Sequence, residues 1–320
     1  MALGEFELIR RFFAEPKVKH PSTVLSVGDD CALLQIEQGQ DLVVTTDTMV
    51  EGVHFLPDVD PENLGHKLLA VNLSDLAAMG AEPRWATLAL TLPHCDEAWL
   101  QGFARGFFGL AERYGVELIG GDTTRGPLTL TVQAMGLVER DRALRRSGAL
   151  PGDLIYLTGE LGAAGMGLKI LQGKTAIEDP TAIRHLERPE PRVDIGLKLR
   201  GLASSCIDVS DGLAADLWHI LEASGVGATL DWEQLPLPDG VRRYLAETGD
   251  WSMPLSAGDD YELCFTVPPA NRDELEARLR SVACPYARIG RIEPQARLML
   301  FKDGRSIELS RNGYQHFSND

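Results

Sequence analysis

The sequence predicts a two-domain protein of the α+β class, or of a mixed α/β kind. Strand-like runs with β-branched or alternating residues recur along the whole chain, and stretches with helical periodicity lie between them. A length of 320 residues is enough for two domains, and 44% apolar with 24% charged residues is typical of a globular protein. The turn-rich run RRSGALPGD at 145–153 separates two series of elements, so we place a boundary near residue 148, between domains 1–148 and 149–320.

The first half is expected to form a sheet whose strands are interrupted by two helices. The first helix begins at Asp60, an N-cap residue followed by proline at the first helical position, and ends before Gly80. The second helix begins at Asp96 and ends at Gly115. Strands are predicted at 23–27, 31–36, 42–47, 85–92 and 128–138.

The second half alternates strands and helices more regularly. This alternation favours an α/β domain at the C-terminal end of the chain. Strands are predicted near residues 154, 206, 226, 261 and 286, and helices near residues 162, 192, 212, 240 and 270.

Charge and cysteine content restrict the class of partner and the compartment. The net charge of -16 argues against nucleic acid and against anionic membranes, because both require basic surfaces. The N-terminal run MALGEFELIRRFF has early acidic residues and no apolar signal core. Five cysteines are an odd number without C-x-x-C spacing, as expected for reduced thiols. We therefore expect a cytoplasmic protein.

Five short segments repeat one arrangement, in which a strand-like run ends in small residues and carboxylates. An exposed turn explains any one of them, since Asp and Gly are common turn residues. Five are harder to explain in that way, and neighbouring carboxylates repel each other unless a cation compensates their charge. The segments are VGDD at 27–30, LVVTTDT at 42–48, LIGGDTT at 118–124, CIDVSDG at 206–212 and SAGDDYE at 256–262.

The first predicted helix carries a possible addition to this acidic set. Asn72, Asp75 and Met79 lie on one helical face, with leucines around them. Asp75 either faces solvent or points toward the same acidic site as Asp30 and Asp47, and spacing alone leaves both interpretations open.

Two glycine-containing segments imitate nucleotide-binding motifs without matching them. The run GELGAAGMG at 159–167 has the register G-x-x-G-x-x-G, which differs from the dinucleotide fingerprint, so close helix packing is at least as good an explanation. The run QGKT at 172–175 has Leu168 where a phosphate-binding loop requires its first glycine. A nicotinamide oxidoreductase therefore remains a weak alternative.

The residue types available favour metal-dependent phosphate chemistry. Nucleophilic catalysis has little support, because G-x-S-x-G is missing and the seven histidines are scattered. Many Asp oxygens with Ser and Thr hydroxyls suit magnesium, which takes one or two carboxylates together with phosphate oxygens. Two such ions can hold the attacking and leaving oxygens together. An acceptor that is a phosphate monoester is largely ionised at neutral pH, because its second pKa is about 6, and needs no general base.

Seven segments, in order from the N-terminus to the C-terminus, together resemble the thiamine-monophosphate kinase family. The resemblance implies a two-domain fold like that of aminoimidazole ribonucleotide synthetase, whose N-terminal sheets pair in a homodimer. It also implies transfer of the γ-phosphoryl group of ATP to thiamine monophosphate, with thiamine diphosphate and ADP as products and several magnesium ions bound. The segments are GDDCA at 28–32, TTDTMVEGVHF at 45–55, VNLSDLAAMGAEP at 71–83, GGDTTR at 120–125, DVSDGL at 208–213, DYEL at 260–263 and GYQHF at 313–317.

The resemblance also implies roles for individual residues. Asp29 is expected to be structural, whereas Arg146 is the cation expected to stabilise the transferred phosphoryl group, although a solvated surface pair with Arg145 explains it nearly as well. The implied metal ligands are Asp30, Thr45, Thr46, Asp47, Asp75, Asp122, Asp208 and Asp211; Gly121, Asp122, Arg146 and Ser210 match ATP contacts; Arg146, Asp47, Asp122 and Asp208 are the implied catalytic group.

Three further positions match the family's acceptor contacts. His54 matches a substrate position, and Tyr314 is a candidate for stacking on the cationic ring of the acceptor, with core packing as its alternative. Asp259 stands where the family usually has glutamate, so the acidic side chain is one methylene shorter. A relative that phosphorylates another acceptor, or a nucleotide sensor without turnover, also remains open.

Overall fold

The computed structural model describes residues 5–14, 17–28 and 30–311 of the chain. Contacts between residues divide the chain into two compact units. The first comprises Met1–Leu76 with Ala81–Asp141, and the second comprises Ala77–Gly80 with Arg142–Asp320. No described helix is long and apolar enough to cross a membrane.

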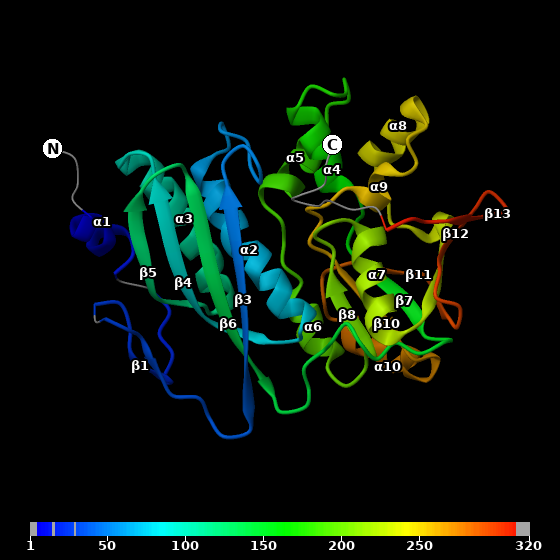
Figure 1. Cartoon of the computed structure of the whole chain (residues 1–320), viewed down its shortest axis with the longest axis horizontal. Coiled ribbons are helices and arrows are strands. Elements are labelled where there is room, and N and C mark those ends of the chain that lie inside the picture. Colours follow the sequence, from blue (N-terminus) through cyan, green and yellow to red (C-terminus); the bar gives the residue numbers. More distant parts are fainter. Residues whose placement is uncertain (1–4, 15–16, 29, 312–320) are drawn as a thin grey trace. The chain divides into compact units, whose positions relative to one another are not determined.

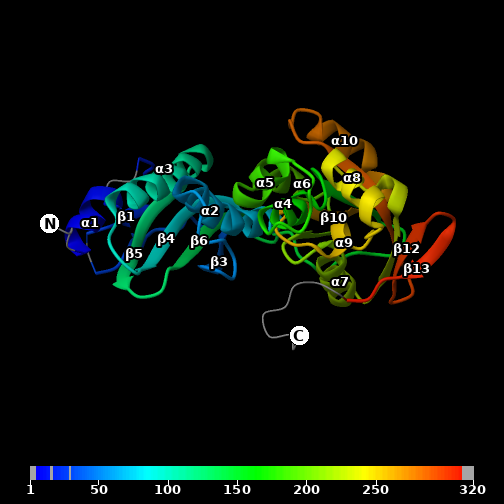
Figure 2. The ribbon, with the colours of Figure 1, turned by 90° about the horizontal axis from the view of Figure 1, so that it is seen from above.

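The first unit is built on a four-stranded sheet whose one face carries helices (Figures 1 and 2). The two central strands pair antiparallel with each other, and one of the edge pairings is parallel. The strand order is β3 (Gln40–Val50), β6 (Thr129–Glu139), β4 (Glu82–Leu92) and β5 (Glu117–Arg125), so β3 and β5 form the two edges.

Local signals explain the helices of the first unit. In α2 (Pro61–Ala78), Asp60 accepts hydrogen bonds from the N–H groups of the first turn, as the sequence predicts. In α3 (Glu97–Tyr114), Asp96 does the same, and Gly115 ends the helix in the left-handed conformation with φ 65°. The smaller elements are α1 (Glu5–Phe12), which was not predicted, and the short antiparallel pair β1 (Thr23–Leu25) and β2 (Leu33–Leu34).

The second unit contains a seven-stranded sheet that is almost entirely antiparallel. Only β9 and β12 pair in parallel, so the unit is closer to α+β than the predicted alternation suggested. The sheet order is β13 (Arg305–Glu308), β12 (Leu298–Lys302), β9 (Gly227–Asp231), β11 (Tyr286–Glu293), β7 (Leu154–Thr158), β10 (Leu263–Val267) and β8 (Ser205–Asp208).

Helices cover both sides of this sheet, and an apolar core lies between the layers (Figure 2). The buried Leu213, Leu217 and Ile220 of α7 pack against strand residues in this core, and each such side chain contributes about 1.5–3 kcal/mol when fully buried. The helices are α4 (Ala163–Leu171), α5 (Pro180–Glu187), α6 (Val193–Leu199), α7 (Leu213–Ser224), α8 (Asp239–Thr248), α9 (Met253–Ser256) and α10 (Arg272–Leu279), with 3-10 turns at Trp232–Gln234 and Pro269–Asn271.

The hairpin of β12 and β13 was not predicted, although the sequence contains a turn signal for it. The strands β12 and β13 are joined by Asp303 and Gly304, whose φ angles are 49° and 73°. An Asp-Gly pair with two positive φ angles is a favoured two-residue hairpin turn.

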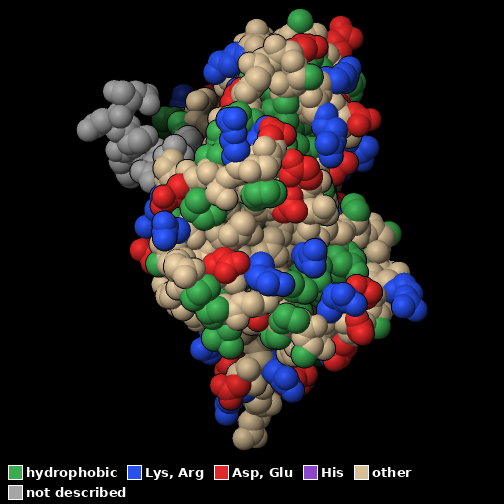
Figure 3. Space-filling model, turned by 90° about the vertical axis from the view of Figure 1, so that its right-hand side faces the viewer, with side chains coloured by type: hydrophobic (Ala, Val, Ile, Leu, Met, Phe, Trp, Pro, Cys, Tyr) green, Lys and Arg blue, Asp and Glu red, His purple; other side chains and the backbone are tan. Residues whose placement is uncertain are grey.

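On the face of the molecule drawn in Figure 3, basic and acidic side chains are interspersed among scattered apolar ones.

Candidate active site

The inner, helix-covered face of the first unit brings Thr45, Asp47 and Asp75 together. Thr45 and Asp47 alternate with outward-pointing residues along β3, and Thr45 Oγ1 donates a hydrogen bond to Asp75 Oδ2 on α2. Burial, and then the negative charge of Asp75, raises the pKa of Asp47 to about 7. Two carboxylates that repel each other beside a hydroxyl oxygen form a donor set suited to a hard cation.

Thr46 and Asp122 lie on the opposite, outer face of the same sheet. Thr48, two residues from Thr46, pairs with Thr131 in the register of β3 and β6, and their hydroxyl oxygens are 2.9 Å apart. Thr131 pairs in turn with Ala89, and Ala89 pairs with Asp122. Because directly paired residues point to the same face, Asp122 shares the face of Thr46 and Thr48.

Asp122 is therefore separated from Asp47 within one chain. The two residues lie on opposite faces and on the two edge strands of the sheet, β5 and β3. Three strand spacings of about 4.8 Å place those edges roughly 14 Å apart. A magnesium ion with ligand distances of about 2 Å cannot bind both carboxylates of one chain in this arrangement.

Gly121 has a structural reason to be glycine. A Cβ atom there would overlap the backbone carbonyl oxygen of Leu88 on the neighbouring strand β4, whereas a Cβ at Gly120 would meet nothing within 4 Å. The close approach of β5 to β4 thus requires Gly121. The ATP contact expected of Gly121 stays a prediction.

The remaining predicted positions of the first unit occupy loops. Asp30 is exposed, and the segment that follows it packs through Ala32 and Leu34 against the outer-face cluster around Trp85. In the turn after β3, the Nδ1 atom of His54 accepts a hydrogen bond from the N–H of Val50 at 3.0 Å. Asp29 and Tyr314 lie outside the described residues.

In the second unit, two predicted acidic segments lie side by side. Strand β8 ends at Asp208 and the loop after it contains Ser210 and Asp211, whereas the loop before β10 contains Asp259. The N–H of Asp259 donates to the carbonyl of Ser210 at 2.9 Å. A Cβ atom on Gly258 would overlap that same Ser210 carbonyl, so the small residue before Asp259 permits the contact.

The loop before β10 is held in a strained conformation. Asp259 and Tyr261 have φ angles of 68° and 49°, which non-glycine residues adopt at a cost of about 1–3 kcal/mol each. The hydroxyl of Tyr261 donates to Asp259 Oδ1 at 3.0 Å, and its N–H donates to the carbonyl of Val209 at 2.8 Å. These contacts aim the Asp259 carboxylate.

Asp216 was missed by sequence reasoning. Its Oδ2 atom accepts hydrogen bonds from three consecutive backbone N–H groups, those of Ser210, Asp211 and Gly212, at 3.0, 3.0 and 3.1 Å. Burial raises the pKa of Asp216 to about 7, against the opposing effect of these N–H groups. The available signal was an aspartate four residues after the glycine of DVSDG, in the first turn of the following helix.

The backbone around Arg146 is tied to the last turn of α7. Ser224 Oγ donates to the Arg146 carbonyl at 3.3 Å and accepts from the N–H groups of Gly148 and Ala149 at 3.1 and 3.2 Å. Burial, followed by the positive charges of Arg146 and Arg311, lowers the pKa of His219 in the middle of α7. Arg146 therefore belongs to a fixed segment beside α7, the helix that follows Asp211.

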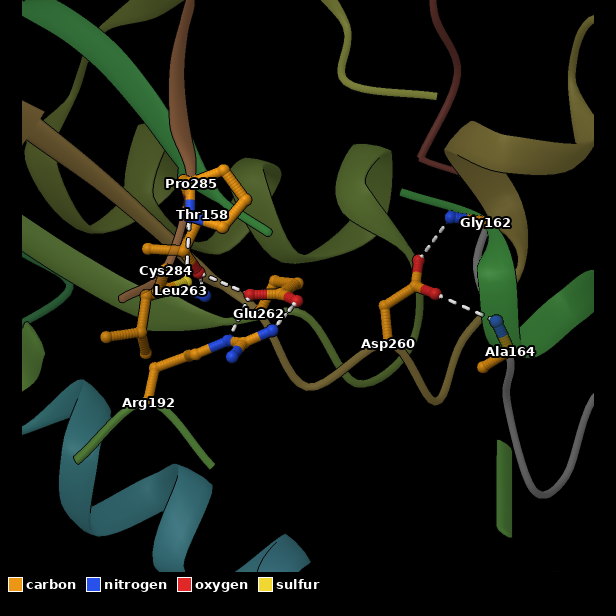
Figure 4. A network of polar contacts seen from close by, with 9 residues as sticks. All are labelled: Thr158, Gly162, Ala164, Arg192, Asp260, Glu262, Leu263, Cys284 and Pro285. Atoms are coloured by element: carbon orange, nitrogen blue, oxygen red, sulfur yellow. Dashed lines mark hydrogen bonds and ion pairs between the residues drawn. The ribbon is translucent and has the colours of Figure 1, made fainter. Parts of the chain in front are cut away.

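In the acidic segment 256–262, Asp260 and Glu262 have structural roles (Figure 4). Asp260 accepts from the N–H groups of Gly162 and Ala164 at 2.7 and 3.2 Å, and Glu262 forms an ion pair with Arg192. Burial raises the pKa of Asp260 to about 8 although both N–H groups act in the opposite direction. This run is thus anchored on two sides.

The glycine-rich segment at 159–167 is explained by packing. A Cβ on Gly159 would overlap the Glu262 carboxylate, and a Cβ on Gly165 would overlap Ala257. A Cβ on Gly167 would overlap the carbonyl of Ala182 on α5. Close packing, one of the two interpretations of this segment, accounts for these glycines without a dinucleotide.

No three His, Cys, Asp or Glu side chains converge as a metal-binding group within the described ranges. The acidic segments form separate groups: Thr45, Asp47 and Asp75 on the inner face, Thr46 and Asp122 on the outer face, and Asp208, Ser210, Asp211 and Asp259 in the second unit.

The chain matches known families over nearly its whole length. Residues 28–138 match the N-terminal domain, and residues 151–303 the C-terminal domain, of AIR synthase related proteins. Thiamine-monophosphate kinase of Escherichia coli K12 is 49% identical over 324 residues, covering 99% of each chain. The enzyme of that name from Bacillus subtilis is 36% identical, covering 98% of this chain and all of that one.

Solved structures lead to the same group. Thiamine-monophosphate kinase of Stenotrophomonas maltophilia superposes with a TM-score of 0.86 at 46% identity, covering 95% of this chain and 98% of that one. A structure of AaThiL complexed with AMPPCP and TMP superposes at 0.77 with 32% identity, covering 99% of both chains. Hydrogenase maturation protein HypE of E. coli reaches 0.80 at only 19% identity, covering 97% of this chain and 96% of that one, which shows a shared fold alone.

Proposed function

Since the chain belongs to the thiamine-monophosphate kinase family of AIR synthase related proteins, we propose how its own residues perform that family's reaction. The activity is the ATP-dependent phosphorylation of thiamine monophosphate, a step of thiamine diphosphate synthesis. The observation that carries this assignment is full-length identity of 49% to a curated kinase, together with likeness to a structure holding AMPPCP and TMP.

The chemistry requires little acid or base catalysis from the protein. An oxygen of the acceptor phosphate attacks the γ-phosphorus of ATP, the bond to the β-phosphate oxygen breaks, and ADP leaves. The attacking oxygen is already ionised at neutral pH, because the second pKa of a phosphate monoester is about 6. Positioning and charge stabilisation then lower the barrier, which is consistent with a site rich in aspartate.

Magnesium fits the inner-face group by donor chemistry. Asp47 and Asp75 repel each other, and Thr45 already shares a hydrogen bond with Asp75, so the oxygens available are those that a hard cation prefers. Magnesium, when bound by these residues, would supply positive charge that offsets the negative charge of the phosphates. We assign Asp30, Thr46, Asp122, Asp208 and Asp211 to the same ligand role as a proposal.

Residues of both units are proposed to contact the substrates. Ser210 and Arg146 would contact the nucleotide, and the backbone of each is held by a hydrogen bond to a residue of α7, Asp216 and Ser224 respectively. His54 and Asp259 would contact the acceptor, with Tyr314 as a further candidate. The Tyr261 hydroxyl and the Ser210 carbonyl fix the direction of the shorter Asp259 side chain.

A homodimer is proposed because one chain separates Asp122 from Asp47. The outer face of the sheet exposes Leu42 and Val44, which are 41% and 49% accessible, beside Thr46. If two outer faces meet about a two-fold axis along the strands, the β3 edge of one chain lies opposite the β5 edge of the other. Asp122 of the partner subunit would then complete the site near Thr46.

The domain boundary near residue 148 and the cytoplasmic location also remain proposals. All five cysteines lie in the described part of the chain and are free thiols, which agrees with a reducing compartment. Cys206 and Cys264 are buried, and burial raises the pKa of both thiols, so they act as core residues.

The activity is tested by incubating the purified protein with Mg-ATP and thiamine monophosphate and separating the products by chromatography. Equal amounts of thiamine diphosphate and ADP are expected, and free thiamine in a parallel reaction should give no product. ADP formation that does not depend on thiamine monophosphate would contradict the assignment.

A further inference from the structure

We propose that Asp216 is a positioning residue: its carboxylate fills a ring of backbone N–H groups in the Asp208–Gly212 loop and thereby orients Asp208, Ser210 and Asp211 toward the phosphates. This inference rests on the proposed function of that loop. It adds a residue that neither the sequence motifs nor the family comparison assigned to the site.

The geometry of the loop carries the proposal. One oxygen, Asp216 Oδ2, accepts from three consecutive N–H groups at 3.0, 3.0 and 3.1 Å. Consecutive N–H groups that converge on one point form a concavity that binds anions. In kinases of other folds such a concavity holds phosphate, whereas here it is filled by a side chain of the same chain.

The hydrogen bonds to Asp216 fix the direction in which the N–H groups of the loop point. With their N–H groups turned toward Asp216, Ser210 and Asp211 cannot use these groups to bind phosphate. Contacts of Ser210 and Asp211 with phosphate or metal are therefore assigned to their side chains, as is that of Asp208 at the end of β8. The loop would therefore contact phosphates and metal ions through side-chain oxygens, which is consistent with a site that depends on metal ions.

Asp216 is also firmly held. It is 3% exposed, and the N-cap residue of its helix is Gly212, which has no side chain to cap the N-terminus. On the other side of the loop, the Ser210 carbonyl accepts from the N–H of Asp259. The loop is thus fixed between α7 and the segment before β10, and Asp216 supplies one of these two attachments.

The first test compares Asp216→Ala with wild type in two measurements. Amide hydrogen exchange should be faster at Ser210, Asp211 and Gly212 and unchanged in β10. The magnesium concentration for half-maximal rate should rise, or kcat should fall, by about 10- to 100-fold, the usual effect of removing a residue that orients metal ligands. The thermal melting temperature reports whether the variant is folded.

Formate provides a sharper readout. Removal of the carboxylate leaves the N–H groups converging on an unfilled space, and formate is small enough to bind there. Added formate should restore a large part of the activity of Asp216→Ala and slow the exchange of the three amides. It should not restore Asp211→Ala, in which the side chain that acts on the ligand is itself missing.

Two further variants keep the test decisive. Asp216→Asn preserves shape and one acceptor oxygen, so it should fold and show an intermediate magnesium requirement even if Asp216→Ala does not fold. Asp179→Ala is the matched control, because Asp179 also accepts two backbone N–H groups, those of Thr181 and Ala182, at the start of α5. It should lose stability without changing the magnesium requirement.

The proposal is overturned if folded Asp216 variants exchange the three amides faster and yet keep the wild-type magnesium requirement and kcat. It is also overturned if formate leaves both exchange and activity of Asp216→Ala unchanged. Absence of kinase activity in the wild type would instead refute the proposed function, and the exchange data would still report on the loop.

Discussion

At the scale of single residues, the acidic motifs contain two kinds of aspartate that the sequence does not distinguish. Asp47 and Asp259 present carboxylates in the groups that we assign to ligands, whereas Asp216 and Asp260 are buried and accept backbone N–H groups. Asp47, Asp259 and Asp260 lie in similar short runs of acidic and small residues, and Asp216 follows such a run by four residues. Burial does not distinguish these framework aspartates from a proposed ligand such as Asp208, which is buried as well, and their framework role follows from the hydrogen bonds that they accept from backbone N–H groups.

Asp47→Asn should remove a repulsion as well as a ligand. Because Asp47 is buried beside Asp75, we expect the metal-free variant to be at least as stable as the wild type. Magnesium should raise the melting temperature of the wild type and have much less effect on the variant, which should also be inactive. An unchanged magnesium-dependent shift in Asp47→Asn would remove Asp47 from the metal site.

Asp260 should make stability depend on pH. Its folded pKa of about 8 lies above the unfolded value of 3.8, so its contribution to stability is complete below about pH 4 and is lost as the pH rises toward 8. The unfolding free energy of the wild type, measured with denaturant from pH 5 to 9, should fall relative to Asp260→Asn by at most about 1.4 kcal/mol per pH unit. A difference between the two proteins that does not vary with pH would contradict this.

At the scale of elements, glycines allow neighbouring segments to approach closely. Gly121 lets β5 approach β4, Gly258 lets the loop before β10 reach Ser210, and Gly165 lets α4 pack on Ala257. Gly165 lies in the segment that imitates a dinucleotide-binding motif, whereas Gly121 and Gly258 lie in two of the acidic segments. Close packing therefore explains these glycines in this chain, and a contact between any of them and a ligand must be tested separately.

The neighbours Gly120 and Gly121 provide that test. Gly121→Ala should lower the unfolding free energy by about 1–3 kcal/mol, because the new methyl overlaps the Leu88 carbonyl. Gly120→Ala should change it by no more than about 0.5 kcal/mol, since the methyl meets nothing within 4 Å. Calorimetry compares the two variants, and equal stability would contradict the packing role of Gly121.

At the scale of the whole molecule, the sheet of the first unit divides the proposed metal ligands between its two faces and two edges. Thr45, Asp47 and Asp75 belong to the inner face, and Thr46 and Asp122 to the outer face. Two chains paired through their outer faces bring opposite edges together. In the dimer that we propose, each site would use residues of both chains.

Mixing two inactive variants tests this arrangement. Asp47→Asn and Asp122→Asn should each be inactive alone. If Asp122 acts on the partner's site, random exchange of subunits makes half of the dimers mixed, each with one intact site, and about a quarter of the wild-type rate should return. If both residues serve the same chain, every site carries a substitution and the mixture stays inactive.

The amino-acid sequence alone determined the chemistry and much of the local structure. The Asp60 and Asp96 caps and Gly115 defined α2 and α3, because these signals act within a few residues. The order of the acidic motifs was enough to identify the family, which the comparisons confirm. Such features can be predicted from the sequence because each depends on residues that are neighbours along the chain.

The tertiary structure decided which of these residues meet. The faces of Asp47 and Asp122 follow from strand register, the role of Asp216 from three backbone N–H groups, and the strain at Asp259 and Tyr261 from the adjoining Val209–Ser210 backbone. The antiparallel sheet of the second unit depends likewise on pairing between distant strands. Side-chain direction, burial and the pairing of distant strands are set only when separate segments of the chain pack together. A local sequence pattern does not contain the distance between such segments or the free energy of their contact.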